Sequence, residues 1–561
     1  MGWGWPMGRR WVGGVAALLL GGALASSGVA PAAGQAALPP SPPRPLSFLH
    51  AGAVAGPANL RQVVDEQGRE VLLKGVNVDG IADYWQQPPA LPTPYPIDPS
   101  QYRAGKCPPD DHAVEGVMVC DFDFAQMRVL GYDAIRLNLS WSLLEPLPGQ
   151  IDTTYIDRIA QVVGWAKAQG IYVILDMHQD AWSKFVYTHP GDNCAALGPG
   201  WGAVRGYDGA PRWASQYVGP ACAFHGVREI DPAVDQCFKK FYLDAAAPDG
   251  VGLQEHYASI FVALARRFKN EDTVAGYEIM NEPNPTPGGS DYTELFPMYA
   301  KVINTVVNQV PKFRQLFFFE PNTLRDVTDF SAEATPWSAY SSYPNAVYAP
   351  HIYTGTFTAD QEIFSTRFFP SDGGYKSAIM DAQLLGVPLW VGEFGNNPSD
   401  DNTLLRSQYQ LQDGYDVAGT LWLWKENAND INSSFFWGVY GPPFDPPTGG
   451  VPRPSRIKFT ARAYPIFTAG VLQSFTYNPD DGSFDMRATS TRVATGDRLQ
   501  AALLYLPAAS QGDVMVEGAT LEVSDRGGGS REVYVYPQGG AYHVHLVTTA
   551  SGGTVLPNTS R

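Results

Sequence analysis

The sequence predicts an α/β fold: a (β/α)8 TIM barrel over residues 41–458, followed by a C-terminal antiparallel β-sandwich over residues 459–561. Eight short apolar runs alternate with stretches of helical periodicity between residues 71 and 424, which is the pattern of a parallel barrel. The runs are continuously apolar, as expected for strands that are covered on both faces. After residue 459 the helical period disappears, and short β-like runs are separated by Gly, Asp, Asn and Pro.

The expected elements follow one another in a regular order. The expected barrel strands are 71–78, 133–138, 171–176, 274–280, 315–320, 346–351, 388–393 and 419–424. The expected helices are 154–169, 253–269, 292–309, 374–385 and 402–416, and Gly170 stands where the first of them must end. The β-sandwich is expected to use strands near 498–506, 514–523, 531–536 and 541–548.

One connection, residues 177–250, is too long for an ordinary loop of a barrel. It carries many aromatic residues, among them Trp182, Trp201 and Phe224, and three of the five cysteines. We expect this insertion to form a wall for a substrate. The alternative is a locally packed insertion with a small core of its own.

The first 40 residues are expected to be a signal peptide and linker, outside the fold. Arg9 and Arg10 precede an apolar run from Trp11 to Ala25, and small residues follow this run. The run is short and rich in Gly and Ala for a membrane span. We therefore expect a secreted, extracellular protein, with a membrane anchor as the alternative if the run is not cleaved.

Export permits disulfide bonds, and five cysteines leave at least one unpaired. Cys107 and Cys120 are the expected first pair because the loop between them is short. A second pair is expected among Cys194, Cys222 and Cys237, and the sequence leaves its members open. No spacing of Cys and His resembles a zinc site.

The composition excludes some classes of partner. The chain has 39 basic and 56 acidic residues, a net charge of -17, which argues against binding to nucleic acid. The same balance provides no electrostatic attraction to anionic lipid, so any contact with lipid is expected to be apolar. Aromatic residues make up 12% of the chain, which suits surfaces that stack on sugar rings.

Polar residues close nearly every expected barrel strand, where barrel enzymes place their active sites. They are Lys74 and Asn77, Arg136 and Asn138, Asp176, His178 and Asp180, Asn281 and Glu282, Glu320, His351 and Tyr353, Glu393, and Trp424, Lys425 and Glu426. We expect these side chains to form one polar pocket.

Glu282 and Glu393 are the best pair for chemistry in this pocket, because glycoside hydrolysis needs two carboxylates on opposite sides of one bond. One of them protonates the departing oxygen, and the other attacks the anomeric carbon or activates water. Trp424 is expected to form a stacking floor for the sugar. Glu320 is the alternative to either glutamate, whereas Glu278 lies within a strand and is expected to face helices or a buried partner.

Asp176, His178 and Asp180 also permit a metal-site interpretation, because their side chains are of ligand type. No further ligands converge on them in the sequence, so we expect no metal.

These residues carry a resemblance to glycoside hydrolase family 5, whose members are retaining barrel hydrolases. The residues that match the eight pocket residues of that family, in order, are Arg136, His178, Asn281, Glu282, His351, Tyr353, Glu393 and Trp424. Within the family the chain resembles endoglycoceramidases and their endogalactosylceramidase and glucosylceramidase relatives. The matching segments are 74–77 (KGVN), 176–180 (DMHQD), 393–395 (EFG) and 462–465 (RAYP). The insertion and residues 422–427 depart from the family pattern.

The resemblance implies a secreted retaining endo-β-glycosidase that cleaves between oligosaccharide and ceramide in glycosphingolipids. Glu393 would be the nucleophile and Glu282 the acid/base. Lys74 and Asp180 would bind the sugar nearest ceramide, and the other matched residues would bind substrate. We expect no cofactor, a transient apolar contact with a membrane or micelle, and a monomer.

Three alternatives remain open at this point. They are an exo-acting β-glucosylceramidase, a family 5 endoglucanase or mannanase that acts on polysaccharide, and a carbohydrate- or lipid-binding protein without catalysis. The preferred glycolipid series, and the choice between glucose and galactose next to ceramide, also stay open.

Overall fold

The computed structural model describes residues 41–82, 119–204, 206, 209–225, 227–330, 335–356, 372–396, 403–425, 437–441 and 450–547. The expected leader, Cys107 and Glu426 lie outside these ranges. Among the described residues, no helix combines the length and hydropathy that crossing a bilayer requires.

A parallel eight-stranded sheet forms the barrel, and each of its strands overlaps one of the expected runs. The strands are β4 (Gly75–Val78), β5 (Ala134–Ser140), β6 (Tyr172–His178), β9 (Val274–Glu278), β10 (Leu316–Phe319), β11 (Ala346–Tyr348), β12 (Val391–Phe394) and β13 (Gly419–Leu421). They pair in the order β11-β10-β9-β6-β5-β4-β13-β12. Tyr348 closes the ring, because its N–H donates to Pro388 and its carbonyl accepts from the Trp390 N–H. The predicted barrel is therefore confirmed.

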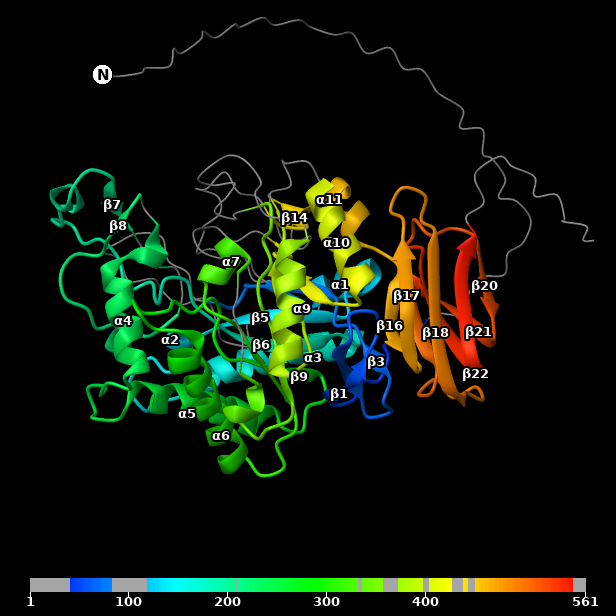
Figure 1. The fold of residues 1–561 in the computed structure, drawn as a ribbon, viewed down its shortest axis with the longest axis horizontal. Coiled ribbons are helices and arrows are strands. Elements are labelled where there is room, and N and C mark those ends of the chain that lie inside the picture. The colour runs from blue at the N-terminus through cyan, green and yellow to red at the C-terminus, as the bar shows by residue number, and fades with distance from the viewer. Residues whose placement is uncertain are drawn as a thin grey trace, which may run out of the picture. The chain divides into compact units, whose positions relative to one another are not determined.

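Helices follow the strands and surround them (Figure 1). The long ones are α1 (Asp121–Leu130), α3 (Thr153–Gln169), α5 (Leu253–Phe268), α6 (Phe296–Gln309), α9 (Gly373–Leu385) and α10 (Thr403–Tyr415), and the short ones are α2 (Trp141–Leu144), α7 (Leu324–Thr328) and α11 (Pro454–Thr460). α3 begins where the Asp152 side chain accepts from two backbone N–H groups, and it ends at Gly170 in the left-handed region, as predicted.

The insertion between β6 and α5 has a core of its own. It contains a hairpin of β7 (Trp201–Ala203) and β8 (Cys222–Phe224) and the helix α4 (Pro232–Tyr242). Trp182 is buried, with its ring centroid 5.0 Å from that of Phe238. Cys194 and Cys222 form a disulfide bond, which identifies the second expected pair, and Cys237 is buried with no disulfide partner among the described residues. The locally packed alternative holds for this part of the insertion.

The C-terminal domain is an antiparallel sheet, as predicted, but its strands divide differently from the expectation. The strands are β16 (Tyr464–Thr468), β17 (Val471–Tyr477), β18 (Phe484–Val493), β19 (Ala502–Leu506), β20 (Asp513–Glu517), β21 (Ala519–Gly527) and β22 (Ser530–Val547). The runs 531–536 and 541–548 are one strand, β22. The run 514–523 is two strands, because the chain turns at Gly518, where a Cβ would lie 2.2 Å from the Ala541 carbonyl oxygen. Two short strands, β14 (Tyr440–Gly441) and β15 (Val451–Pro452), pair separately.

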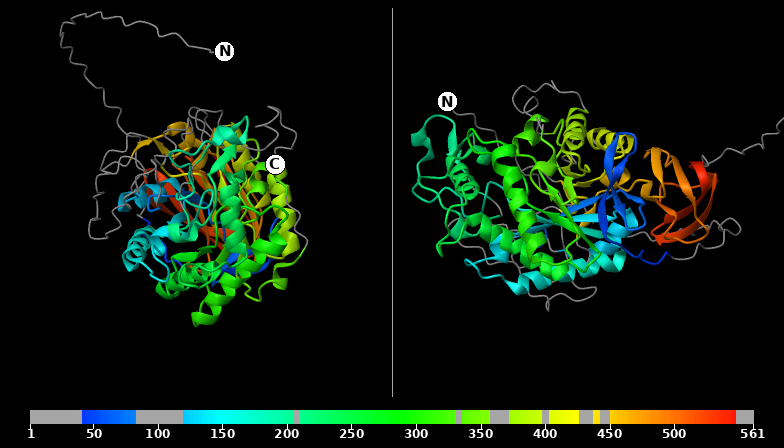
Figure 2. Two further views of the ribbon diagram at one scale, coloured as in Figure 1. Left: turned by 90° about the vertical axis from the view of Figure 1, so that its left-hand side faces the viewer. Right: turned by 60° about the horizontal axis from the view of Figure 1, so that its bottom comes forward.

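Three N-terminal strands extend this same sheet. They are β1 (Leu49–Ala55), β2 (Leu60–Asp65) and β3 (Glu70–Val71), and β3 pairs with β16. Figure 2 shows these blue strands beside the orange C-terminal ones. The expected boundary at residue 458 therefore does not separate the two sets of strands, because the sheet uses both ends of the described chain.

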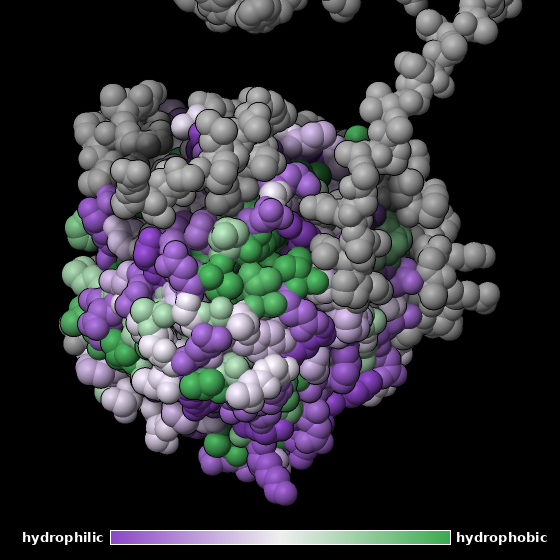
Figure 3. All heavy atoms as spheres, turned by 90° about the vertical axis from the view of Figure 1, so that its right-hand side faces the viewer, coloured by the Kyte–Doolittle hydropathy of each residue, from purple (hydrophilic) through white to green (hydrophobic). Residues whose placement is uncertain are grey.

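Three hydrogen bonds attach the C-terminal sheet to the end of α1. The hydroxyl groups of Tyr464 and Tyr505 donate to the Gly131 and Val129 carbonyls at 2.7 and 2.8 Å, and Arg526 Nε donates to the Arg128 carbonyl at 2.6 Å. The Val129 carbonyl lies in the last turn of α1, where a helix leaves carbonyl groups without intrahelical partners, and the Arg128 carbonyl accepts this bond in addition to one from the Gly131 N–H. On the face shown in Figure 3, apolar side chains form a compact group among hydrophilic ones.

A buried pair of carboxyl groups near this junction predicts a pH-dependent stability. Burial raises the pKa of Asp416 to about 6, and burial beside Asp416 raises the pKa of Glu70 well above its usual value. The native protein therefore holds a proton on Asp416 that the unfolded chain releases near pH 4. Its contribution to stability is present below pH 4 and is lost as the pH rises through 6.

The variant D416N should lack this contribution to the pH dependence. Asparagine keeps the shape and tolerates the positive φ of residue 416. From pH 4 to pH 7, the free energy of unfolding of D416N should rise relative to wild type by on the order of 2 kcal/mol. Urea denaturation at several pH values measures this difference, with the exposed Glu517→Gln as a control. Parallel pH curves for D416N and wild type would contradict the prediction.

Candidate active site

Arg136 lies at the centre of the site. It belongs to β5 and is fully buried. Its guanidinium group contacts four carboxyl groups, those of Asp176, Glu278, Glu320 and Glu393. It also donates hydrogen bonds to the side-chain oxygens of Asn77 and Asn281, at 3.0 and 2.8 Å. The carboxyl ends of five strands therefore converge on one cation, as the positions of these residues along the chain predict.

Glu393, on β12, is held by two donors. Arg136 Nη1 donates to Oε1 and the Tyr353 hydroxyl donates to Oε2, both at 2.7 Å. Burial raises the pKa of Glu393, whereas the positive charges of His351 and Arg136 oppose that rise. Burial next to Glu393 raises the pKa of Tyr353 well above its usual value, so its phenol remains a donor. This environment positions an anion with little rotational freedom, which suits a nucleophile.

Glu282 follows β9 and faces His351. His351 Nδ1 lies 2.8 Å from Glu282 Oε1 and 3.6 Å from Glu393 Oε2, so one imidazole nitrogen is close to both glutamates. The Glu282 side chain is 23% exposed, whereas that of Glu393 is 6% exposed. Arg325 Nη1 donates to the His351 carbonyl at 2.8 Å. A Cβ at Gly392 would lie 3.0 Å from the His351 ring, so the ring depends on a glycine beside it.

Three more buried carboxyl groups surround this pair. Burial raises the pKa of Glu320 to about 8, and His351 opposes the rise. Burial and then Glu282 raise the pKa of Asp326, which lies on α7, well above its usual value. Oxygens of Glu278 and Glu320 and a nitrogen of His351 lie within 4.8 Å of one another, a spacing that a metal ion could use. The Arg136 guanidinium already contacts the carboxyl groups of Glu278 and Glu320, so their negative charges are balanced by Arg136.

His178, at the end of β6, connects a charge network to an aromatic surface. Its Nδ1 lies 2.8 Å from Asp176 Oδ2, and its Nε2 lies 3.7 Å from Asp180. Burial disfavours the charged ring, but Asp176 and Asp180 raise the pKa of His178 well above its usual value. Trp422 stacks on the His178 ring, with the centroids 5.7 Å apart and the planes 14° apart. Asp180 also pairs with Arg228, at 3.1 Å.

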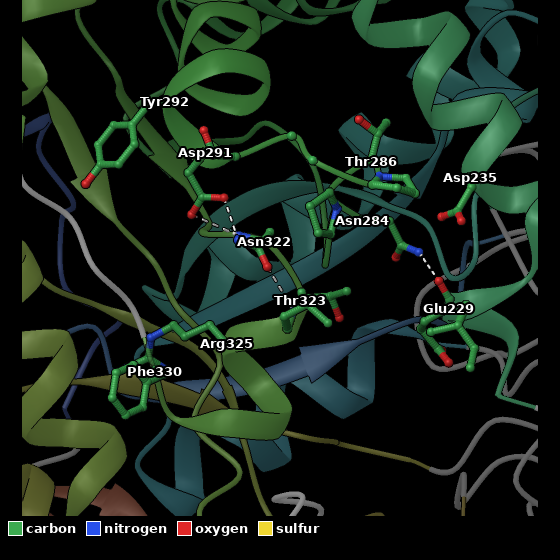
Figure 4. A pocket seen from close by; sticks show the side chains of 17 residues that line it. Glu229, Asp235, Asn284, Thr286, Asp291, Tyr292, Asn322, Thr323, Arg325 and Phe330 are labelled. Carbon is green, nitrogen blue, oxygen red and sulfur yellow. Dashed lines mark hydrogen bonds between the residues drawn. The ribbon is translucent and has the colours of Figure 1, made fainter.

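A pocket of about 570 Å³ is lined in part by residues 284–292, which follow Glu282 in the chain, but neither Glu282 nor Glu393 lines it. Its walls come from the segment after Glu282, from the turn after β10 with α7, and from the end of the insertion; Figure 4 labels Glu229, Asp235, Asn284, Thr286, Asp291, Tyr292, Asn322, Thr323, Arg325 and Phe330. Asp291 accepts from Asn322 Nδ2 at 2.6 Å in its polar wall. Ile230, Leu324 and Phe330 are 49%, 51% and 70% exposed and give the pocket an apolar rim. The insertion therefore reaches the pocket through residues 229–235.

Lys74 does not join the other predicted residues. It precedes β4 and so lies at the amino end of the barrel strands. Its Nζ pairs with Asp413 Oδ1 at 2.8 Å, and Asp413 also binds Arg462. The expected strand 71–78 is in fact β3 and β4 with a break between them, which explains the error. Lys74 therefore supports the junction with the C-terminal sheet and is not a residue of the pocket.

The prediction that Trp424 forms the stacking floor for the sugar is wrong. It is fully buried, and its Nε1 donates to Asp123 Oδ1 on α1 at 3.0 Å. β13 ends at Leu421, three residues before the end of the expected strand, so the residue that follows the strand is Trp422. Trp422 stacks on His178 and packs with Tyr353 and Trp437.

Other residues that the strand-end pattern does not single out also shape the site. Gln179 Nε2 donates to the Asn281 and Glu282 carbonyls at 2.6 and 2.8 Å. Glu278 has the buried partner that was expected, and this partner is Arg136. Asp326 follows no strand directly, so the strand-end pattern carried no signal for it. The structure brings together the remaining predicted residues, Arg136, His178, Asp180, Asn281, Glu282, His351, Tyr353 and Glu393.

A closed parallel barrel with two glutamates at the carboxyl ends of its strands defines the class of barrel glycoside hydrolases. Residues 121–428 match the family model described as cellulase (glycosyl hydrolase family 5), and residues 462–548 match the glycoside hydrolase family 5 C-terminal domain. The chain belongs to glycoside hydrolase family 5, and it is a glycosidase related to endoglycoceramidases.

Three similar proteins describe this relation. The chain is 26% identical over 549 residues to endoglycoceramidase I of Rhodococcus hoagii (strain 103S), covering 92% of each chain. The crystal structure of endogalactoceramidase matches with a TM-score of 0.71 at 28% identity, covering 90% of this chain and 100% of that one. The ganglioside GM3 complex of endo-glycoceramidase II from Rhodococcus sp. has a TM-score of 0.63 at 23% identity, covering 87% and 99% of the two chains, and shows a common fold.

Two substitutions should separate the roles of the neighbouring tryptophans. W422L removes the ring that stacks on His178, and kcat/KM for a β-glycoside should fall by about tenfold to a hundredfold as a sugar-stacking surface is lost. W424F removes the hydrogen bond to Asp123 and should lower the free energy of unfolding by about 1 kcal/mol, with little change in KM. Steady-state kinetics and thermal unfolding of both variants measure these effects. Equal kinetic losses in both would contradict the assignment of Trp422 to the pocket.

Proposed function

We propose that this enzyme is a retaining endo-β-glycosidase that cleaves between the oligosaccharide and the ceramide of glycosphingolipids. The observation that carries the proposal is the pair Glu393 and Glu282, which lie in different environments and share His351 Nδ1. Two carboxyl groups in one pocket with different surroundings suit two different roles. The similarity to endoglycoceramidases supports this choice of substrate class.

The reaction proceeds in two displacements. The Glu393 carboxylate attacks the anomeric carbon while Glu282 donates a proton to the departing oxygen, which gives a glycosyl-enzyme and a free aglycone. Glu282 then takes a proton from water, and this water attacks the anomeric carbon and releases Glu393. Asn281 precedes Glu282 and accepts from Arg136, which also donates to Glu393, and this position suits a contact with the sugar 2-hydroxyl.

The closeness of the two glutamates supports retention. His351 Nδ1 lies 2.8 Å from Glu282 Oε1 and 3.6 Å from Glu393 Oε2. The distance between these two carboxylate oxygens therefore cannot exceed the sum of those two distances. Inverting enzymes separate their carboxyl groups by roughly 6.5–9.5 Å to leave room for water. This limit applies to the two nearest oxygens and is compatible with direct attack by Glu393, and membership of glycoside hydrolase family 5 supports the same choice.

The departing group belongs on the side of Glu282, which protonates it. The pocket that follows Glu282 has a polar wall and an apolar rim, which suits an amphiphilic aglycone such as ceramide. Ile230, Leu324 and Phe330 supply the rim, whereas Trp182 of the insertion is buried in its core. These exposed apolar side chains would also make the transient contact with a membrane or micelle.

We also propose that the protein is exported. The apolar run after Arg9 and Arg10 supports this, and so does the disulfide bond between Cys194 and Cys222, because disulfide bonds persist in oxidising compartments.

Product analysis tests the proposed reaction. With a ganglioside or another glycosphingolipid, mass spectrometry should detect the whole oligosaccharide and ceramide, and the variant E393S should release neither. Thermal unfolding of E393S provides the control for its fold. Release of one sugar at a time would support an exo-acting glucosylceramidase, and hydrolysis of cellulose or mannan alone would support a polysaccharide hydrolase. Near-normal turnover by E393S would contradict the assignment of the nucleophile.

The rim should matter only for lipid-linked substrates. The double variant L324S/F330S exposes less apolar surface, so KM for a glycosphingolipid in mixed micelles should rise by about tenfold, in line with the loss of 1 to 2 kcal/mol of apolar contact. Its kcat/KM for a soluble aryl glycoside should stay within about twofold of wild type. The matched control is M515S, which changes an exposed apolar residue of β20. Equal effects on both substrates would exclude the rim as a lipid contact.

A further inference from the structure

Glu320 is a buried acidic residue of the site to which the reaction described above gives no role. It follows β10 and is 1% exposed. Its Oε1 lies 3.2 Å from Arg136 Nη2 and 3.1 Å from His351 Nε2. Its Oε2 accepts the backbone N–H of Glu282 at 3.0 Å. One side chain thus contacts both Glu282 and the histidine that Glu282 faces.

We propose that Glu320 is a positioning residue for acid/base catalysis: it holds the backbone of Glu282 and fixes His351 so that Nδ1 is the ring nitrogen that shares a proton with Glu282. The inference rests on the acid/base role proposed for Glu282.

The backbone of Glu282 needs such support. Its φ is +37°, in the left-handed region that residues with a Cβ rarely adopt. Gln179 donates to its carbonyl and Glu320 accepts from its N–H, so both neighbouring peptide groups are held by buried side chains. The direction of the Glu282 side chain depends on this φ, because a change in φ rotates Cβ away from the pocket.

The contacts of Glu320 also orient the His351 ring. The Arg136 guanidinium and the Glu282 N–H can only donate, so both Glu320 oxygens act as acceptors. His351 Nε2 lies 3.1 Å from Glu320 Oε1, at ion-pair distance but outside hydrogen-bond geometry, so this contact is electrostatic. With Nε2 on the side of Glu320, Nδ1 is the ring nitrogen that faces Glu282, at 2.8 Å.

The charges around this group agree with a retained proton. Burial opposes a charged ring, but Glu320 and Glu393 raise the pKa of His351 well above its usual value. The titratable groups that act on Glu320 or His351 include Arg136 on β5, Asp180 after β6, Glu278 on β9, Glu282 after β9, Tyr299 on α6, Asp326 on α7 and Glu393 on β12. Glu320 is the one that touches both His351 Nε2 and the Glu282 backbone.

The dependence of rate on the leaving group tests the proposal. An alkyl β-glycoside needs protonation of its leaving oxygen, whereas a dinitrophenyl β-glycoside of the same sugar does not. In E320Q, the amide NH2 must face the Glu282 N–H or the N–H groups of Arg136 and His351, so one of these contacts is lost and Glu282 and His351 shift. We expect kcat/KM for the alkyl glycoside to fall by about a hundredfold. For the dinitrophenyl glycoside it should fall by less than about threefold.

Two variants calibrate this comparison. E282Q must show the same dependence on the leaving group in a stronger form, and its failure to do so would contradict the proposed function itself. E278Q changes another buried acid on Arg136 that does not contact Glu282, so it should lower both activities by one factor. Neither substrate carries ceramide, so the result does not depend on the lipid specificity.

The proposal has clear contrary outcomes. It is overturned if E320Q lowers both activities equally, as E278Q should, or if E320Q lowers neither. If E320Q does not fold, E320D replaces it, because it keeps a buried carboxyl group and withdraws the oxygens from Glu282 and His351. E320D should then show the same selective loss with the alkyl glycoside, and a uniform loss or wild-type kinetics would overturn the proposal.

Discussion

The buried guanidinium of Arg136 is the interaction on which the rest of the site depends. Asp176, Glu278, Glu320 and Glu393 come from four different strands or strand ends, and their charges would repel one another in a space without water. A cation with five donors in a fixed plane can serve several acceptors at once. Removal of one partner from such a buried group leaves an uncompensated charge, which costs several kcal/mol. The barrel therefore closes around Arg136 with its acids already oriented.

This arrangement also explains why Glu282 and Glu393, in one active site, have different hydrogen-bond partners and different exposure to solvent. Glu393 lies against Arg136 and Tyr353, and its lone pairs are directed by two donors. Glu282 has no contact with Arg136 among its recorded hydrogen bonds and ion pairs within the described residues; its carboxyl group meets His351 and is more open to solvent. A nucleophile needs a fixed anion, and an acid/base needs a partner with which a proton is shared. The contact of Glu393 with Arg136, and of Glu282 with His351, supports the division of roles proposed for them.

Much of the barrel could be predicted from the sequence because buried parallel strands are continuous apolar runs, and the residues that close them are polar for a reason. All eight strands and the five expected helices are present. The errors arose at strand ends. A run of apolar residues does not show that β3 and β4 are separate strands in different sheets, and for this reason Lys74 was predicted to lie in the active site. Nor does it show that β13 ends at Leu421, and for this reason Trp424 was predicted in place of Trp422.

Other features depended on contacts that local sequence does not carry. The sheet that joins β1–β3 to β16 connects segments about four hundred residues apart, and no local pattern encodes such pairing. From the sequence, Glu278 resembles an ordinary strand residue and Glu320 an alternative catalytic glutamate. Their contacts with Arg136, which lies on another strand, cannot be predicted from the residues around them. Asp326 lies on a short helix, where a single acidic residue carries no signal of function.

The sugar end and the proposed aglycone end of the active site differ in how strongly the fold constrains their residues. Family membership is therefore more informative about the reaction than about the aglycone. The sugar end is built from strand ends that converge on Arg136, so a substitution there disturbs a buried charge balance. The proposed aglycone end is built from the segment after Glu282, the turn with α7 and residues 229–235 of the insertion, and its apolar rim of Ile230, Leu324 and Phe330 is exposed. Exposed loop residues change at little cost in stability. The chemistry of a family 5 glycosidase is thus tied to the fold, whereas the proposed choice of ceramide would depend on a few rim residues such as Leu324 and Phe330.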